Sequence, residues 1–357
     1  ILHYDLPVAS ITLSDSPVCS GETVETELIG DLGLGWAWTS PVVSADNPLI
    51  GDYDSNTTFI AVINSEDGCA AVVTKTLIVH QPIDPGDISA DQEICSETIP
   101  EELTGPAATG GDGVFTYQWQ SSTNGSAWSD ISGATSLSYQ PGELTETTLF
   151  RRVVFSSTPC PAVTQYTPVT ITVNEIPTVT SPSAVSICSH EAVDYVITSD
   201  VPGTTFAWTG ANTSGTVTGI TASGSGTSIN DILSIPPGGM ASGIATYTII
   251  PTGPAPTFCP GDPFELVVTV LPLPIPSFID GATPVCVGSS GNLYRTESGM
   301  TNYNWTISSG GTINSGQGTY EISVTWTSTA GPKWVRVSYT GTNGCEPLEP
   351  AQFNVSV

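Results

Sequence analysis

The sequence predicts an all-β protein, built as a tandem array of four β-sandwich domains. The first observation is an internal repeat in which a cysteine, an aromatic-x-Trp step, a second cysteine and a closing strand recur four times. The second is the alternation of apolar and polar residues, as in 320–326 and 334–339, which places one face of a strand in a core. The third is the turn residues between these stretches, with no window of helical periodicity.

Proline-marked junctions divide the chain into four repeats. Prolines follow a closing strand at Pro82 and Pro85, at Pro177 and along 272–276, where they end the strand and stiffen the connection. Residues 1–7 resemble the last strand of a preceding repeat, so we expect this chain to be a segment of a longer array. The predicted domains are 1–85, 86–177, 178–274 and 275–357.

One tryptophan recurs at the same position of every repeat. Its aromatic neighbour two residues earlier lies on the same strand face, which fits either core packing or an exposed platform for sugar rings. Recurrence in all four repeats favours the core. The predicted core tryptophans are Trp38, Trp119, Trp208 and Trp305. Trp128, Trp326 and Trp334 lie outside this pattern and are candidates for a surface role.

Each repeat contains two cysteines, and no C-x-x-C spacing occurs. The even number and regular placement predict disulfides and an oxidising, extracytoplasmic setting. We expect pairing within each repeat, although the two cysteines of a standard sandwich would lie at opposite ends. These pairs would be Cys19–Cys69, Cys95–Cys160, Cys188–Cys259 and Cys286–Cys345. The alternative joins neighbouring repeats as Cys19–Cys160, Cys95–Cys259 and Cys188–Cys345, and leaves Cys69 and Cys286 to pair with repeats outside the segment.

The charge balance excludes one class of function. The net charge is −28 with only six Lys and Arg, so a basic surface for nucleic acid cannot form. The sequence has no apolar run long enough to span a membrane. We expect no cofactor, except that calcium could bind carboxylates at the first junction. The candidate ligands are Asp84, Asp87 and Asp91, with Asp52 and Asp54.

No catalytic arrangement is visible, so we do not expect an enzyme. The three histidines, His3, His80 and His190, belong to no Ser/His/Asp or Cys/His pattern and are expected to be exposed polar residues. The nearest carboxylate pairs, Glu101 with Glu102 and Asp52 with Asp54, resemble turn or edge residues more than a glycosidase pair.

With these landmarks in place, the chain resembles a known class of repeats. Repeat 3 contains Val201–Trp208 and Cys259-Pro-Gly, repeat 4 contains Tyr303-Asn-Trp305, and repeat 2 contains Tyr117–Gln120 and Phe150–Val154. Repeats 3 and 4 are similar to PKD-like domains and repeat 2 to Ig-like domains, whereas repeat 1 fits either. Such repeats occur in very large cell-surface adhesins of Bacteroidota, of the SprB gliding-motility type, which the type IX secretion system exports.

The resemblance implies an all-β tandem array of four Ig-like/PKD-like sandwiches on the outside of a bacterial cell. It implies a stalk or spacer segment of a large secreted adhesin, acting in cell-surface adhesion or gliding motility. The expected partners are neighbouring repeats of the same chain, and surface glycans or the substratum. The alternative function is a carbohydrate-binding array in a secreted polysaccharide-acting protein.

Overall fold

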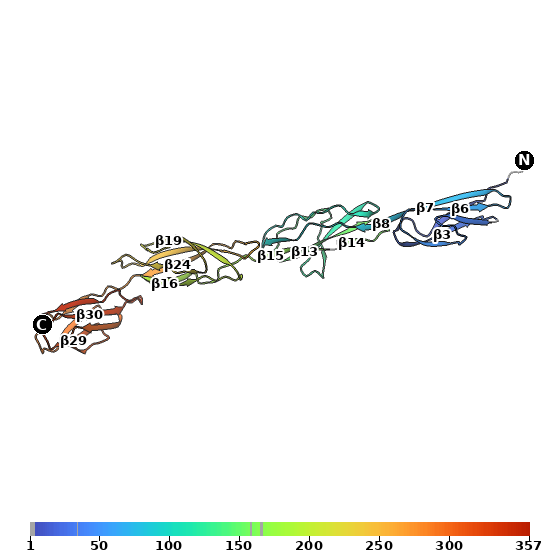
Figure 1. The fold of residues 1–357 in the computed structure, drawn as a ribbon. Coiled ribbons are helices and arrows are strands. Elements are labelled where there is room, and N and C mark those ends of the chain that lie inside the picture. The colour runs from blue at the N-terminus through green and yellow to red at the C-terminus, as the bar shows by residue number, and fades with distance from the viewer. Residues whose placement is uncertain (1–3, 34, 158, 165–166) are drawn as a thin grey trace. The chain divides into compact units, whose positions relative to one another are not determined.

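The structure is a computed structural model and describes residues 4–33, 35–157, 159–164 and 167–357. The all-β class is confirmed, because all the regular secondary structure in this part of the chain is β-strand (Figure 1). Within these ranges no helix is present that could cross a membrane. The chain divides into two compact units, 1–174 and 175–357. Unit 1 contains sandwiches 1 and 2, and unit 2 contains sandwiches 3 and 4.

Sandwich 1 is formed by two three-stranded sheets with strand orders β1-β3-β5 and β4-β6-β7. Alternate residues of its strands point inward, because period-two alternation gives each strand one apolar face. Trp38 and Phe59 lie fully buried at the centre, with ring centroids 6.0 Å apart. The strands are β1 (Ala9–Leu13), β2 (Val18–Cys19), β3 (Glu22–Gly30), β4 (Gly35–Ser40), β5 (Leu49–Tyr53), β6 (Thr57–Asn64) and β7 (Ala70–Leu77).

Strand β8 (Val79–Asp84) belongs to both sandwiches of unit 1. Its beginning pairs in parallel with β2, and its end pairs with β10 (Thr109–Gly111) of sandwich 2. A small apolar cluster, which includes Ile83 and Val154, packs at this crossing. The chain therefore passes from one sandwich to the next as a hydrogen-bonded strand.

Sandwich 2 has one extended sheet, ordered β12-β11-β13-β15-β9, with β14 beside β13. The facing layer is formed by segments joined through the isolated bridges Thr98↔Leu144 and Leu103↔Tyr139. Trp119 and Ile171 are fully buried between the layers. The remaining strands are β9 (Gln92–Cys95), β11 (Phe115–Ser122), β12 (Ser129–Asp130), β13 (Thr148–Ser156), β14 (Val163–Thr164) and β15 (Val169–Asn174).

Sandwich 3 has a five-stranded sheet, β16-β24-β23-β19-β20, and two short pairs, β17-β22 and β18-β21. All contribute to one core, in which Trp208 packs edge-on against Tyr247. The Tyr247 hydroxyl donates to Asp231 Oδ2 at 2.6 Å, which satisfies the buried phenol. The strands are β16 (Ala184–Cys188), β17 (Glu191–Ala192), β18 (Tyr195–Val196), β19 (Thr205–Ser214), β20 (Ser223–Ser225), β21 (Ser228–Ile229), β22 (Ile232–Leu233), β23 (Gly243–Thr252) and β24 (Phe264–Leu271).

Sandwich 4 has a four-stranded sheet, β25-β26-β29-β28, and a three-stranded sheet, β27-β30-β31. Its core holds two indoles. Trp305 is 2% exposed and Trp326 is fully buried, with its Nε1 donating to the Tyr294 hydroxyl at 3.1 Å. The strands are β25 (Phe278–Gly281), β26 (Asn292–Thr296), β27 (Thr301–Ile307), β28 (Gly311–Ser315), β29 (Glu321–Trp326), β30 (Lys333–Thr340) and β31 (Ala351–Val355).

Candidate functional site at the disulfide-bridged junctions

A disulfide joins sandwich 1 to sandwich 2 where β8 crosses between them. Cys19 ends β2, directly beside His80 of β8, and Cys160 follows β13 of sandwich 2. Their Cα atoms lie 5.1 Å apart across a sequence separation of 141. The two cysteines are 7% and 4% exposed, so the bond is shielded from solvent.

Arg152 holds the chain that leaves β8. Its Nη2 donates hydrogen bonds to the carbonyl oxygens of Pro85 at 2.7 Å and Pro106 at 2.9 Å, and its Nη1 donates to that of Leu137 at 2.9 Å. The guanidinium also lies 5.0 Å from the ring centroid of Tyr117. The side chain has no exposed surface, and burial lowers its pKa. Because a buried cation is costly without partners, these carbonyls fix both Arg152 and the junction.

A second disulfide joins sandwich 3 to sandwich 4 in the same way. Cys188 ends β16 opposite Leu271 of the closing strand β24, and Cys345 lies between β30 and β31. Their Cα atoms are 5.7 Å apart across a sequence separation of 157. Asn343 adds a hydrogen bond from its Nδ2 to the carbonyl oxygen of Pro272 at 2.7 Å. In both units, the first cysteine of one sandwich is bonded to the second cysteine of the next.

The linker of unit 2 enters sandwich 4 beside Glu297. Ser277 donates to this carboxylate from its backbone N–H and its hydroxyl, and Thr296 and Tyr339 donate from their hydroxyls. Partial burial alone would raise the pKa of Glu297, but these hydrogen bonds outweigh it and hold the pKa at about 2. The charged carboxylate therefore anchors the first residue after the proline linker.

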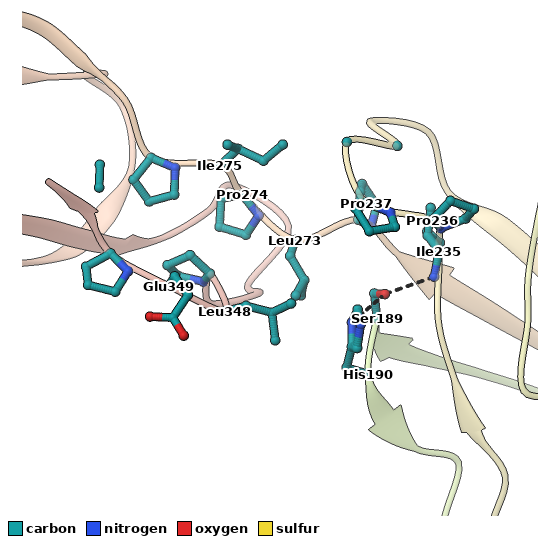
Figure 2. Close-up of a pocket in the computed structure, with 17 residues that line it drawn as sticks. Ser189, His190, Ile235, Pro236, Pro237, Leu273, Pro274, Ile275, Leu348 and Glu349 are labelled. Atoms are coloured by element: carbon teal, nitrogen blue, oxygen red, sulfur yellow. Dashed lines mark hydrogen bonds between the residues drawn. The ribbon is translucent and has the colours of Figure 1, made fainter.

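A cavity of about 380 Å³ lies at the junction of unit 2 (Figure 2). Prolines and aliphatic side chains form most of its lining, and Ile275 and Leu348 are 63% and 66% exposed. Ser189, His190 and Glu349 are its polar side chains. The Ser189 hydroxyl accepts from the Ile235 N–H at 2.9 Å and lies 3.0 Å from His190 Nδ1. This junction is therefore held by its disulfide and its hydrogen bonds, not by close packing.

Pairing within each repeat, the expected arrangement, is wrong. Cys19 lies beside His80 of β8, the strand that leaves sandwich 1. Cys69 directly precedes β7, which runs along the chain into β8, so the whole length of β7 separates the two cysteines. The eight residues of β7 span roughly 26 Å, far more than a disulfide can bridge. The bonds follow the alternative for Cys19–Cys160 and Cys188–Cys345, while Cys95–Cys259 stays a prediction.

Two further cysteines, Cys69 and Cys286, carry free thiols in this structure; Cys69 is half-buried and Cys286 is exposed.

The tryptophans separate into buried and partly exposed groups. The four repeated ones, Trp38, Trp119, Trp208 and Trp305, are at most 8% exposed. The surface role expected for Trp326 is wrong, because alternation along β29 places it on the inner face with Ile322 and Val324. Trp128 and Trp334 are partly exposed, and each lies under a guanidinium, of Arg151 at 4.2 Å and of Arg336 at 4.4 Å from the ring centroid.

The aspartates considered for calcium do not form a cluster. Asp84 Oδ1 accepts from the Gly86 N–H, Asp91 Oδ1 accepts from the Thr170 N–H, and Asp87 is exposed. Within the described ranges, no group of three or more acidic, cysteine or histidine side chains could hold a metal ion.

The other candidate chemical groups lie in local hydrogen bonds. Asp52 and Asp54 accept from the hydroxyls of Thr23 and Ser20, and Glu102 accepts from that of Ser138. Of the histidines, His80 lies in β8, His190 lies at the cavity of unit 2, and His3 lies outside the described residues.

Comparisons with known proteins agree with this architecture. Two family models described as "PKD-like domain" match residues 185–274 and 272–355, and a "domain of unknown function" family matches residues 84–175. No curated protein matches the chain.

Among solved structures, the titin I-band fragment I67–I69 covers 74% of this chain and 99% of its own, at 10% identity and TM-score 0.42. Sidekick-1 immunoglobulin domains 1–4 cover 98% and 99%, at 10% identity and TM-score 0.26. The insect immune protein hemolin covers 98% and 99%, at 11% identity and TM-score 0.27. These weak likenesses carry no argument about function. The strands, the layered cores and the PKD-like matches together describe a tandem array of Ig-like and PKD-like β-sandwich domains.

Proposed function

We propose that this chain is a stalk or spacer segment of a large secreted cell-surface adhesin, and that it serves adhesion or gliding motility at a bacterial surface. The observation that carries the proposal is the disulfide pattern, in which bonds connect successive sandwiches. An Ig-like/PKD-like repeat fold is typically non-catalytic, and the proposal includes no enzymatic step.

The bonds give tension a short covalent route. Force that enters unit 1 before Cys19 passes through the disulfide to Cys160 and leaves through β15. The chain between these cysteines lies outside that route, so tension cannot extend it while the bond is intact. Cys188–Cys345 provides the same route in unit 2. A spacer that transmits force needs this property, whereas an isolated binding module does not.

The setting follows from the same bonds. Disulfides form and persist in oxidising compartments, which supports a secreted location. The net charge of −28 favours solubility and opposes lateral association of neighbouring stalks. The resemblance to giant surface adhesins supports a bacterial cell surface and adhesion or gliding as the setting.

The free thiols extend the pattern. Cys69 occupies the position of Cys160 and Cys345 in its own repeat, and Cys286 occupies that of Cys19 and Cys188. We propose that Cys69 and Cys286 take the same bonds with further sandwiches of this type.

The proposal is tested in the cell that produces the protein. Antibodies against residues 1–357 should label intact, unpermeabilised cells, and deletion of the coding segment should reduce attachment or gliding. Labelling only after permeabilisation would contradict the surface location. Normal attachment and gliding in the deletion strain would contradict the adhesive role.

One observation favours glycans as a ligand of such an adhesin. Partly exposed tryptophans accompany arginines on the outer faces of sandwiches 2 and 4, and indole faces stack well on sugar rings. The carbohydrate-binding alternative therefore remains as a second function of the array.

A further inference from the structure

We propose that the outer face of sheet β27-β30-β31 in sandwich 4 binds an oligosaccharide that carries a carboxylate. The inference deepens the adhesive part of the proposed function and rests on it, whereas the route of tension through the disulfides does not depend on it. The face, called here the polar face, consists of seven side chains: Asn304, Thr306, Trp334, Arg336, Ser338, Gln352 and Asn354.

Strand alternation assembles the polar face. Val335, Val337 and Tyr339 of β30 point into the core and are at most 3% exposed, so the residues between them point outward. The register places Arg336 between Thr306 of β27 and Gln352 of β31. Seven polar or amphipathic side chains are thus brought into neighbouring rows of one sheet.

Arg336 is held flat on this face. Its Cζ lies 4.4 Å from the Trp334 ring centroid, and its Nε donates to Gln352 Oε1 at 2.7 Å. Gln352 in turn donates through Nε2 to Asn354 Oδ1 at 2.9 Å. Both terminal nitrogens, Nη1 and Nη2, have no protein partner within the described ranges, so the guanidinium presents two fixed donor nitrogens to solvent.

Arg336 differs in this respect from the other cations of unit 2. Arg295 is paired with Glu321, and Lys333 is buried and donates to the carbonyl oxygens of Ser309 and Ala330. In a chain with 34 acidic residues, Arg336 is exposed and has no acidic partner among the described residues, so its charge is open to an anionic ligand. Its two parallel donors match a carboxylate.

The polar face continues into a groove suited to sugar hydroxyls. A depression of about 260 Å³ adjoins Ser338 and is lined largely by Asn302, Asn304, Thr340 and Glu346. From Trp334 to Ser338 there are four residue steps along β30, which span roughly 13 Å, so the ligand must extend over more than one sugar ring. The part of the Trp334 indole that stays exposed beside the guanidinium offers a surface for the apolar face of one ring, and the amides and hydroxyls offer partners for the next.

Local charge permits an acidic ligand here. Residues 275–357 contain three basic and five acidic side chains, whereas residues 1–85 contain one and twelve. Since charges are screened beyond about 8 Å at physiological ionic strength, the near balance of sandwich 4 matters more than the charge of the whole chain.

Sandwich 2 provides a matched control. Arg151 lies over Trp128, and its Nε donates to Gln120 Oε1 at 2.7 Å, which repeats the chemistry around Arg336. The next outward positions of β13 are Val153 and Phe155, so the polar row does not continue along this strand as it does along β30. We expect this arginine stack to stiffen its sheet without binding the ligand.

Calorimetric titration of the full 357-residue chain tests the inference, with tetragalacturonate as the acidic probe and cellotetraose as the neutral one. We expect binding of the acidic probe and at least about tenfold weaker binding of the neutral one. Arg336→Gln and Trp334→Ala should each weaken acidic binding by about tenfold or more. Arg151→Gln should leave the dissociation constant within about twofold. Thermal unfolding of each variant confirms that it is folded.

Three results would overturn the inference. They are no heat with tetragalacturonate at millimolar concentration, equal affinity for both probes, and an unchanged dissociation constant in a folded Arg336→Gln protein. None of these would affect the surface-labelling or force measurements, so failure of the ligand assignment can be told apart from failure of the spacer role.

Discussion

The bond between Cys19 and Cys160 should decide how far unit 1 can be stretched. The separation of 141 residues, at about 3.5 Å per residue, amounts to roughly 490 Å of chain that tension cannot extend while the bond is intact. In residues 1–174, only segments 1–18 and 161–174 then remain extensible, which is roughly 110 Å. Replacing both cysteines by serine should therefore release about 490 Å of additional contour length.

Single-molecule force extension of residues 1–174, held at its two ends under non-reducing conditions, measures this length directly. Wild-type protein should reach its limit after short extensions, and the Cys19→Ser/Cys160→Ser protein should show unfolding of both sandwiches. Cys69→Ser is the matched control, because it removes a thiol without removing a bond. It should behave as the wild type does.

A contradictory result is easily recognised. If wild-type protein with its disulfide intact, as verified by non-reducing peptide mapping, extends by several hundred ångströms, force reaches the sandwich interiors by another path. The tension argument for a spacer would then be wrong, even though the bond itself exists.

Three other predictions concern stability. Arg152→Met should lower the unfolding free energy by about 3 kcal/mol in urea titrations, because three carbonyls lose their donor, whereas Arg151→Met should change it by about 1 kcal/mol or less; equal effects would refute the anchoring role. Trp119→Ala should cost about 3–5 kcal/mol through the cavity it leaves, and Trp128→Ala much less; a mild Trp119→Ala effect would contradict the core. Since the folded pKa of Glu297 is about 2 and its usual value is 4.5, its contribution is present above pH 4.5 and is lost as pH falls towards 2. Glu297→Gln should flatten the unfolding free energy between pH 4.5 and 2. If the variant loses stability over this range as steeply as the wild type does, the role given to Glu297 is wrong.

The sequence was sufficient for the fold because the β-sandwich signal is local. Alternation fixes which face of each strand is buried, and it does so even where the residue at an inward position is polar or charged. Trp326 shares the face of Ile322 and Val324, so consistent use of alternation would have predicted its burial. In the same way, Arg152 lies between Phe150 and Val154 on the inner face of β13.

The junctions could not be read in the same way. Whether two cysteines meet depends on which ends of successive sandwiches adjoin, and that is set by β8 and the proline linkers, not by spacing in the chain. The partners of Arg152 are backbone carbonyls from three separate segments, which carry no side-chain signal. The polar face likewise depends on the register of three strands distant in sequence.

The burial of Cys19 and Cys160 also affects how long the link survives outside a cell. A thiol must approach a disulfide sulfur closely before exchange can occur, and here both cysteines are less than a tenth exposed. A thiol can therefore attack the disulfide only after the junction between sandwiches 1 and 2 has opened. The lifetime of the disulfide is then set by the rate at which the junction opens locally. Once opening is the slow step, adding more reductant should no longer accelerate cleavage.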